Sequence, residues 1–224
     1  MTPAAAPLLR LTLVRHGETT GQSSLRYYGA TDVPLSADGE AQMRRAGATL
    51  AGERFTAVYS SSLCRARRGA ELVTGGRCAV VALAAFDEVD FGRWEGLTRD
   101  EIAARDPQAF RDWQADPEQV VYPEGECRRA FQRRVSKALH ALLDDAPGDH
   151  LLLVAHRGII AVALAELLGL DAAARRALQI DLGSIHVMVR EHGRWRAERV
   201  NHVPSAPPPL ACDSARAAVR GEPA

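Results

Sequence analysis

A five-residue apolar run at residues 151–155, which stops abruptly at His156, most constrains how this chain can fold. A short, continuous apolar segment bounded by polar residues is typical of a strand that is buried on both faces. Similar runs at residues 11–14 and 57–59 also stop at polar residues. We therefore expect a sheet whose two faces are both covered by other elements.

Helical patterns lie between these runs. Ser36 is suited to cap a helix that extends to about residue 50. Further helices are expected at residues 63–73, 126–143 and 159–168, the last closed by Gly169, and further strands at residues 78–83, 185–189 and 195–200. Strands that alternate with helices predict an α/β fold, specifically a three-layer α/β/α sandwich around a mostly parallel sheet.

The domain organisation follows from length and local composition. A chain of 224 residues suits one domain with a modest insertion, and we expect residues 1–204 to form it. Residues 87–125 contain Trp94, Trp113 and several prolines, with room for only short helical pieces. We interpret them as a small helical lid. Residues 205–224 are rich in Pro and Ala and are expected to form a disordered tail.

Charge and apolar content exclude several classes of protein. Lys+Arg and Asp+Glu both number 28, so affinity for anions requires a local cluster of arginines, and we expect neither a nucleic-acid nor a membrane partner. No stretch approaches the roughly 18 apolar residues of a membrane span. Four cysteines are widely spaced, at Cys64, Cys78, Cys127 and Cys212. This spacing predicts free thiols and a cytoplasmic location. We expect the chain to be a monomer or a homodimer.

Reactive side chains follow three of the expected strands, as Arg15-His16, the polar segment 60–65, and His156-Arg157. Because ligands bind beyond the carboxyl ends of parallel strands, we expect these groups to form one site. Arginine offers a fork of donors that matches phosphate oxygens. A neutral imidazole at His16 beside such a cation is a competent nucleophile for phosphorus.

The sequence around this histidine, Arg15-His16-Gly17, resembles the Arg-His-Gly motif of the histidine phosphatase superfamily, the phosphoglycerate mutase-like proteins. Five further segments are similar to family motifs and follow in the family's order within residues 11–201: residues 29–39, 60–66, 88–96, 123–126 with Arg134-Val135, and 154–156. The loop at residues 28–35 resembles that of alpha-ribazole phosphatases and of broad-specificity phosphatases.

The resemblance implies a metal-independent phosphatase without a cofactor, acting on a small phosphate ester. His16 would attack phosphorus and form a phosphohistidine, while Arg15, Arg65 and His156 would surround the phosphoryl group and neutralise its charge. Glu88 would be the general acid that protonates the leaving alkoxide. Competing candidates for the acid lie nearby: Asp87, Asp90 and Glu95.

Some positions depart from the family pattern. Gln22 stands where many members have Asn, and its longer amide could still contact a phosphate oxygen. Arg157 follows His156 where the family typically has Gly, and its side chain either points away or contacts a second acidic group of the substrate. Ser62 and Gly69 replace the usual Pro and Thr. These departures leave the catalytic groups in place and bear on the identity of the substrate.

Three other functions compete with hydrolysis. A phosphoglycerate mutase shares the phosphohistidine, but cofactor-dependent mutases of the family carry a longer insertion than residues 96–123 allow. A metallohydrolase that uses His16, Glu18 and His156 as ligands would lack the usual ligand spacing. A phosphate-binding module without turnover would be expected to lack the nucleophile or the acid.

Other histidines and a run of arginines carry weaker signals. We assign the remaining histidines structural or surface roles and expect His202 to be the one nearest the site. The arginine run is interpreted as a solvated helix face, or alternatively as a flank of the entrance that attracts anionic substrates: Arg128, Arg129, Arg133 and Arg134.

Overall fold

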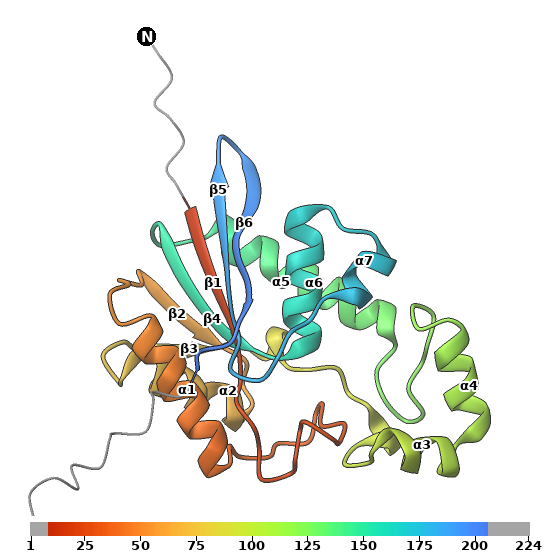
Figure 1. Cartoon of the computed structure of the whole chain (residues 1–224). Coiled ribbons are helices and arrows are strands. Elements are labelled where there is room, and N and C mark those ends of the chain that lie inside the picture. The colour runs from red at the N-terminus through yellow and green to blue at the C-terminus, as the bar shows by residue number, and fades with distance from the viewer. Residues whose placement is uncertain (1–8, 206–224) are drawn as a thin grey trace, which may run out of the picture.

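The computed structural model describes residues 9–205, in which one six-stranded sheet is flanked by helices (Figure 1). The strands are β1 (Leu9–Arg15), β2 (Ala57–Ser60), β3 (Val80–Ala82), β4 (His150–Ala155), β5 (Ile185–Glu191) and β6 (Arg194–His202). The α-helices are α1 (Ala37–Thr49), α2 (Cys64–Thr74), α3 (Arg99–Arg105), α4 (Pro107–Ala115), α5 (Arg128–Asp144), α6 (Arg157–Leu168) and α7 (Ala172–Ala177). Two short 3-10 helices are η1 (Ala84–Phe86) and η2 (Gly92–Trp94).

The order of the strands in the sheet is β3-β2-β4-β1-β5-β6. The first four are parallel, whereas β5 pairs antiparallel with β1 and β6 antiparallel with β5. The predicted α/β sandwich with a mostly parallel sheet is therefore confirmed. The antiparallel hairpin at one edge was not part of that prediction.

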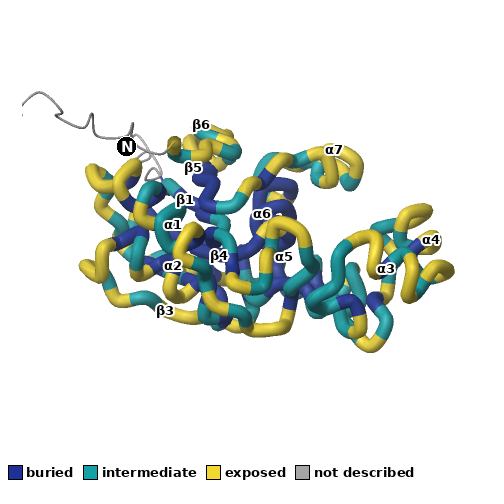
Figure 2. The backbone as a smooth tube through the Cα atoms, turned by 60° about the horizontal axis from the view of Figure 1, so that its bottom comes forward, coloured by how far each residue is buried: buried dark blue, intermediate teal, exposed yellow. Residues whose placement is uncertain are grey.

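The buried strand β4 shows how the core is divided. Leu151 and Leu153 pack in the core that contains Phe131 of α5 and Ile160 of α6. Leu152 and Val154 point to the opposite face, where they pack in the core formed with α1 and α2. Successive side chains of a strand alternate between faces, so an uninterrupted apolar run requires helices on both sides. Figure 2 shows β4 and the neighbouring helix α6 as largely buried, whereas β6 at the edge of the sheet is largely exposed.

Local signals set the helix ends where the sequence indicated. The Ser36 side chain accepts a hydrogen bond from the Gly39 N–H at 3.0 Å and so caps α1. Gly169 takes a left-handed conformation, with φ of 66°, directly after α6. Two differences remain, because β3 is shorter than the predicted strand at 78–83 and α7 was not predicted.

The insertion at residues 87–125 contains η2, α3 and α4, which stand to one side of the sheet (Figure 1). Thr98 and Glu101 form a reciprocal capping box that starts α3. Trp94 packs against Trp113 and Tyr122, with ring centroids 5.9 and 5.7 Å apart. The predicted short helical pieces are thus present, and an aromatic cluster holds them together.

Three further expectations concern membrane spans, the cysteines and the C-terminal tail. Within residues 9–205 no helix is long and apolar enough to cross a bilayer. Cys64, Cys78 and Cys127 are free thiols. Cys212 and the tail beyond Ser205 lie outside the described residues.

Candidate active site

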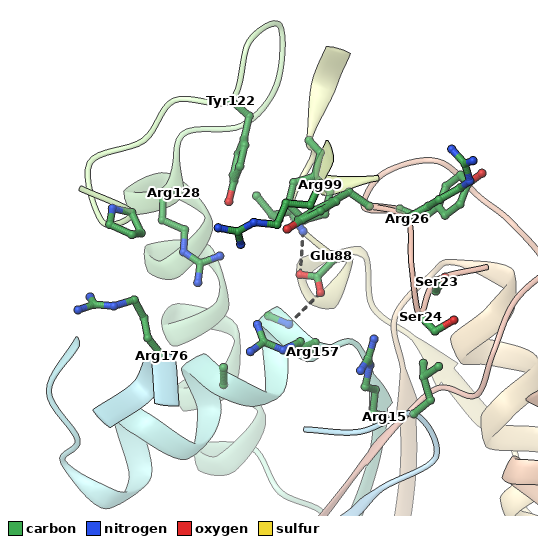
Figure 3. Close-up of a pocket in the computed structure, with 18 of the residues that line it drawn as sticks. Arg15, Ser23, Ser24, Arg26, Glu88, Arg99, Tyr122, Arg128, Arg157 and Arg176 are labelled. Carbon is green, nitrogen blue, oxygen red and sulfur yellow. Dashed lines mark hydrogen bonds between the residues drawn. The ribbon is translucent and has the colours of Figure 1, made fainter. Parts of the chain in front are cut away.

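Three strand ends meet at one edge of the sheet, and residues at the ends of two of them, β1 and β4, line a large cavity. β4 lies between β1 and β2, and Val154 pairs with Val14 and with Ser60. The polar residues that follow these strands therefore come together. The cavity has a volume of about 700 Å³. Of the site residues predicted from the sequence, four line it: Arg15, His16, Glu88 and Arg157. Figure 3 shows three of them, Arg15, Glu88 and Arg157.

His16 is a buried and neutral imidazole with one nitrogen committed. His16 is only 4% exposed, and its Nδ1–H donates to the Gly17 carbonyl oxygen at 2.7 Å. Because an oxygen acceptor requires the proton on Nδ1, Nε2 keeps its lone pair. Burial lowers the pKa of His16 well below 6.5, and the positive charges of Arg65 and Arg15 add to the effect. The ring is therefore uncharged at neutral pH, with an unprotonated Nε2.

His156 faces His16, with the two ring centroids 5.1 Å apart. Its Nε2 lies 2.6 Å from the Ser61 hydroxyl, which also accepts a hydrogen bond from the Leu63 N–H. We assign the hydroxyl as donor to Nε2, which leaves the proton on Nδ1. That buried Nδ1 has no hydrogen-bond partner among residues 9–205. Burial and the charge of Arg65 lower the pKa of His156 well below 6.5 as well.

Two of the predicted phosphate-binding arginines, Arg15 and Arg65, lie in different surroundings. Arg15 lines the cavity and donates from Nη1 to the Ile180 carbonyl oxygen at 2.8 Å. Arg65 is fully buried and donates to the carbonyl oxygens of Thr31 and Gly29 at 2.9 and 2.7 Å. Each arginine retains a buried Nε with no partner in the described structure. Arg65 thus holds the loop at residues 28–31 and also supplies positive charge near both histidines.

Glu88 is the one carboxylate among the four candidate acids that lines the cavity. Its Oε2 accepts from the Gly158 N–H at 2.8 Å and its Oε1 from the Val89 N–H at 3.0 Å. Gly158 belongs to the first turn of α6, and a Cβ there would lie 2.3 Å from the Glu88 Oε1. The glycine therefore permits the close approach of the carboxylate to the helix N-terminus.

The competing carboxylates are occupied elsewhere. Asp87 accepts from the Ser62 N–H and hydroxyl at 2.7 and 2.6 Å. Asp90 accepts from the Gly92 N–H. Glu95 accepts from four main-chain N–H groups, those of Gly29, Ala30, Thr31 and Phe91. Glu95 therefore binds main-chain N–H groups of the loop at residues 28–31, and Arg65 binds carbonyl oxygens of the same loop.

The remaining predicted residues fall around the site with different outcomes. Gln22 has a left-handed φ of 63°, and the cavity is lined by its neighbours Ser23 and Ser24, not by Gln22 itself. Arg157 is the first residue of α6, and its side chain extends into the cavity (Figure 3). Of the alternatives for Arg157, pointing toward the pocket is the one the structure adopts.

Two further expectations concerned Glu18 as a metal ligand and His202 as the histidine nearest the site. Glu18, a candidate metal ligand, instead accepts hydrogen bonds from the Thr19 and Ser24 N–H groups. Within residues 9–205, no group of three or more His, Cys, Asp or Glu side chains could hold a metal ion. His202 is exposed on β6, whereas the side chain of the preceding Asn201 donates to Asp181, which lines the cavity.

The structure decides between the two interpretations of Arg128 and adds further residues to the cavity wall. Arg128 lines the cavity, so the solvated-face interpretation is wrong for it, although Arg129 and Arg133 are exposed. Ser61 holds His156, and the Ser-Ser pair at the end of β2 was the signal available for it. No local pattern distinguished the other additions to the cavity wall: Arg99, Glu118, Tyr122, Arg175 and Arg176.

A buried neutral histidine among arginines, at the strand ends of an α/β sandwich, defines a protein that handles phosphoryl groups. Comparison with known families identifies which one. The histidine phosphatase superfamily (branch 1) matches residues 11–203, and the chain belongs to this family.

Individual relatives carry two kinds of name. The adenosylcobalamin/alpha-ribazole phosphatase of Escherichia coli (strain K12) is 31% identical over 176 residues, covering 78% of this chain and 87% of that protein. A probable phosphoglycerate mutase of Klebsiella pneumoniae is 31% identical over 191 residues, covering 85% and 89%. The crystal structure of a putative alpha-ribazole-5'-P phosphatase from Escherichia coli superimposes with a TM-score of 0.82 at 27% identity, covering 89% and 99%.

Proposed function

We propose that this chain is a phosphomonoesterase that hydrolyses a small phosphorylated metabolite through a phosphohistidine on His16. The observation that carries the proposal is the state of the His16 ring. Its Nδ1–H is fixed by the Gly17 carbonyl, and burial with two arginines keeps the imidazole neutral. Such a ring presents an Nε2 lone pair to an electrophilic phosphorus.

In the first step Nε2 of His16 attacks phosphorus, and the bond from phosphorus to the ester oxygen breaks. Glu88, in its protonated form, transfers a proton to the departing alkoxide, which leaves as an alcohol. Arg15, Arg65 and the Nδ1–H of His156 neutralise the charge on the phosphoryl oxygens. The unpartnered buried nitrogens of these three side chains supply donors for that purpose.

In the second step water attacks the phosphohistidine from the side that the alcohol has vacated. The Glu88 carboxylate takes the proton from this water, the P–N bond breaks, and inorganic phosphate is released. Glu88 thereby returns to its protonated form and Nε2 of His16 regains its lone pair. The cycle needs no metal and no cofactor.

The same proposal covers the organisation of the chain. Residues 1–204 would form a single catalytic domain, and residues 87–125 would cover its site. The free thiols of Cys64, Cys78 and Cys127 suit a reducing compartment, which supports a cytoplasmic location. Gln22 does not line the cavity, although its neighbours Ser23 and Ser24 do, and its contact with a phosphate oxygen stays a prediction.

The decisive experiment is hydrolysis of p-nitrophenyl phosphate by the wild type and by His16→Ala, each with and without EDTA. We expect activity that survives EDTA and disappears in His16→Ala. His192→Ala is the matched control, because His192 is exposed in the turn between β5 and β6, at the end of the sheet opposite His16. Activity in His16→Ala would refute the nucleophile, and loss of wild-type activity in EDTA would favour the metallohydrolase.

A phosphoglycerate mutase activity is the second candidate, because relatives with that name are 31% identical to this chain. The two reactions differ in the fate of the phosphoryl group. With a phosphoglycerate as substrate, a phosphatase releases inorganic phosphate, whereas a mutase yields the isomeric ester. We expect phosphate release, and isomer formation without it would establish the mutase.

A further inference from the structure

The cavity extends well beyond His16 and carries an unusual excess of positive charge. Seven arginines line it, against three acidic side chains, Glu88, Glu118 and Asp181. The whole chain has equal numbers of basic and acidic residues, so this excess is local. A low-dielectric concave wall strengthens the attraction of such a cluster for anions.

Four of these arginines are engaged by protein groups. Arg26 pairs with Glu101 outside the cavity wall, and Arg15 belongs to the proposed phosphoryl site. Arg175 and Arg176 both pair with Glu118. Three arginines remain, and none of them forms an ion pair with any side chain of residues 9–205: Arg99, Arg128 and Arg157.

These three side chains come from different elements and approach the same space. Arg99 begins α3, Arg128 begins α5 and Arg157 begins α6. Figure 3 shows their guanidinium groups on the same side of Glu88, below the hydroxyl of Tyr122. Burial raises the pKa of that hydroxyl to about 12, against the opposing charge of Arg128, so it remains a hydrogen-bond donor.

Aromatic rings stack against two of the guanidinium groups, which also contact tyrosine hydroxyls, Arg99 that of Tyr27 and Arg128 that of Tyr122. Arg99 lies over the rings of Phe110 and Trp113, at 5.3 and 5.4 Å from the centroids. Arg128 lies over the ring of Phe131 at 5.5 Å. Stacking uses the face of a guanidinium and leaves the N–H groups on its edge free for a carboxylate or phosphate.

We propose that Arg99, Arg128 and Arg157, with Tyr122, form a second oxyanion-binding subsite that selects phosphate monoesters whose alcohol portion carries another anionic group. This inference rests on the proposed function, because it names the substrate class for that reaction. The phosphoryl group binds between Arg15 and His16, and the second anion binds beneath the lid. A carboxylate and a further phosphate group share the required chemistry.

The subsite also gives a role to the Arg157 side chain at the start of α6. A glycine at this position would contribute only a main-chain N–H to the start of α6. The arginine side chain places a third cation beside Arg99 and Arg128. The consequence is selectivity between substrates, with the chemistry at His16 unaltered.

The test uses two matched series of alkyl phosphates, one ending in a carboxylate and the other in a hydroxymethyl group, over a range of chain lengths. At the best length, kcat/KM should favour the carboxylate by about tenfold or more, as expected for charge-assisted hydrogen bonds. Arg128→Gln and Arg99→Gln should each reduce this ratio most of the way to one. Arg129→Gln is the matched control, because Arg129 is exposed on the same helix and does not line the cavity. Replacing the carboxylate by a phosphate then distinguishes the two anions.

If the wild type has equal kcat/KM for the two series at every chain length, that result is sufficient to overturn the subsite. An equal loss of preference in Arg129→Gln would assign the effect to general surface charge and would also overturn it. Hydrolysis of p-nitrophenyl phosphate, measured in parallel, separates this failure from that of the proposed function. A wild type inert towards all of these esters would refute both.

Discussion

The chemistry proposed for His16 depends on a tautomer and a charge state that can be observed directly. Burial, then Arg65 and Arg15, hold its pKa well below 6.5, and the Gly17 carbonyl places the proton on Nδ1. At about pH 6, where a free imidazole is substantially protonated, ¹⁵N NMR should show His16 neutral with the proton on Nδ1. Arg15→Gln should move its titration to higher pH. A doubly protonated ring in the wild type at this pH would contradict the prediction.

The role of Glu88 predicts a dependence on the leaving group. Glu88→Gln keeps the size of the side chain but cannot give up a proton. Turnover of alkyl phosphates, whose alkoxides are strongly basic, should fall by roughly 10²- to 10⁴-fold. With p-nitrophenyl phosphate, the variant should still release a burst of nitrophenolate equal to the enzyme concentration, followed by slow turnover.

This result has a matched control in the neighbouring carboxylates. Asp90→Asn changes a side chain that accepts from the Gly92 N–H and does not line the cavity. It should keep the wild-type ratio of alkyl to nitrophenyl ester turnover. An equal loss on both esters in Glu88→Gln, without a burst, would show that Glu88 is not the acid.

At the scale of elements, one carboxylate joins the lid to the helices beside it. Glu118 follows α4, pairs with Arg175 and Arg176 at the end of α7, and accepts from Gln132 of α5 at 2.9 Å. Burial alone would raise the pKa of Glu118, but the hydrogen bonds from Arg175 and Gln132 outweigh it and bring the pKa to about 2. This connection is therefore ionised throughout the neutral and mildly acidic range.

Breaking that connection should loosen the lid selectively. In Glu118→Gln, amide exchange in residues 107–122 should become about fivefold faster, since a partly buried ion pair contributes on the order of 1 kcal/mol. Exchange in β1 and β4 should not change. Glu124→Gln is the control, because its carboxylate pairs only at 3.4 Å with Arg93 and is largely exposed. Equal effects of the two variants would show that Glu118 does not anchor the lid.

For the whole molecule, buried neutral histidines link folding to pH. His186 is fully buried on β5, contacts the Ser184 hydroxyl and accepts from the Asn201 N–H. Burial lowers its pKa from 6.5 to about 4. The unfolded chain therefore binds more protons in this window. Stability is complete above the unfolded pKa and is lost as the pH falls from about 6.5 towards 4. His16 and His156 act in the same direction.

This linkage can be measured by urea unfolding. Between about pH 7 and pH 5, His186 should account for a loss on the order of 2 kcal/mol in the free energy of unfolding. His186→Gln, which can still form hydrogen bonds but does not titrate, should lose that much less stability over the same interval. The exposed His192 serves as the control, and His192→Gln should follow the wild type. A pH dependence unchanged in His186→Gln would contradict the assignment.

Local information in the sequence determined the elements and the types of residue at the site. The run at residues 151–155 predicted β4 because a strand covered on both faces must be apolar at every position. Ser36 and Gly169 predicted helix ends because capping involves only neighbouring residues. His16 and His156 were expected to meet because parallel strands present their carboxyl ends at one edge.

Only the tertiary structure decided which side chains reach the cavity and which hold it together. The structure separates Glu88 from Glu95 because Glu88 lines the cavity and contacts Gly158, 70 residues away. Ser61, which contacts His156, lies 95 residues from it. Arg99, Arg128 and Arg157 converge because three helices begin around one space. Such convergence depends on packing between distant segments, and neither periodicity nor capping in a single sequence encodes it.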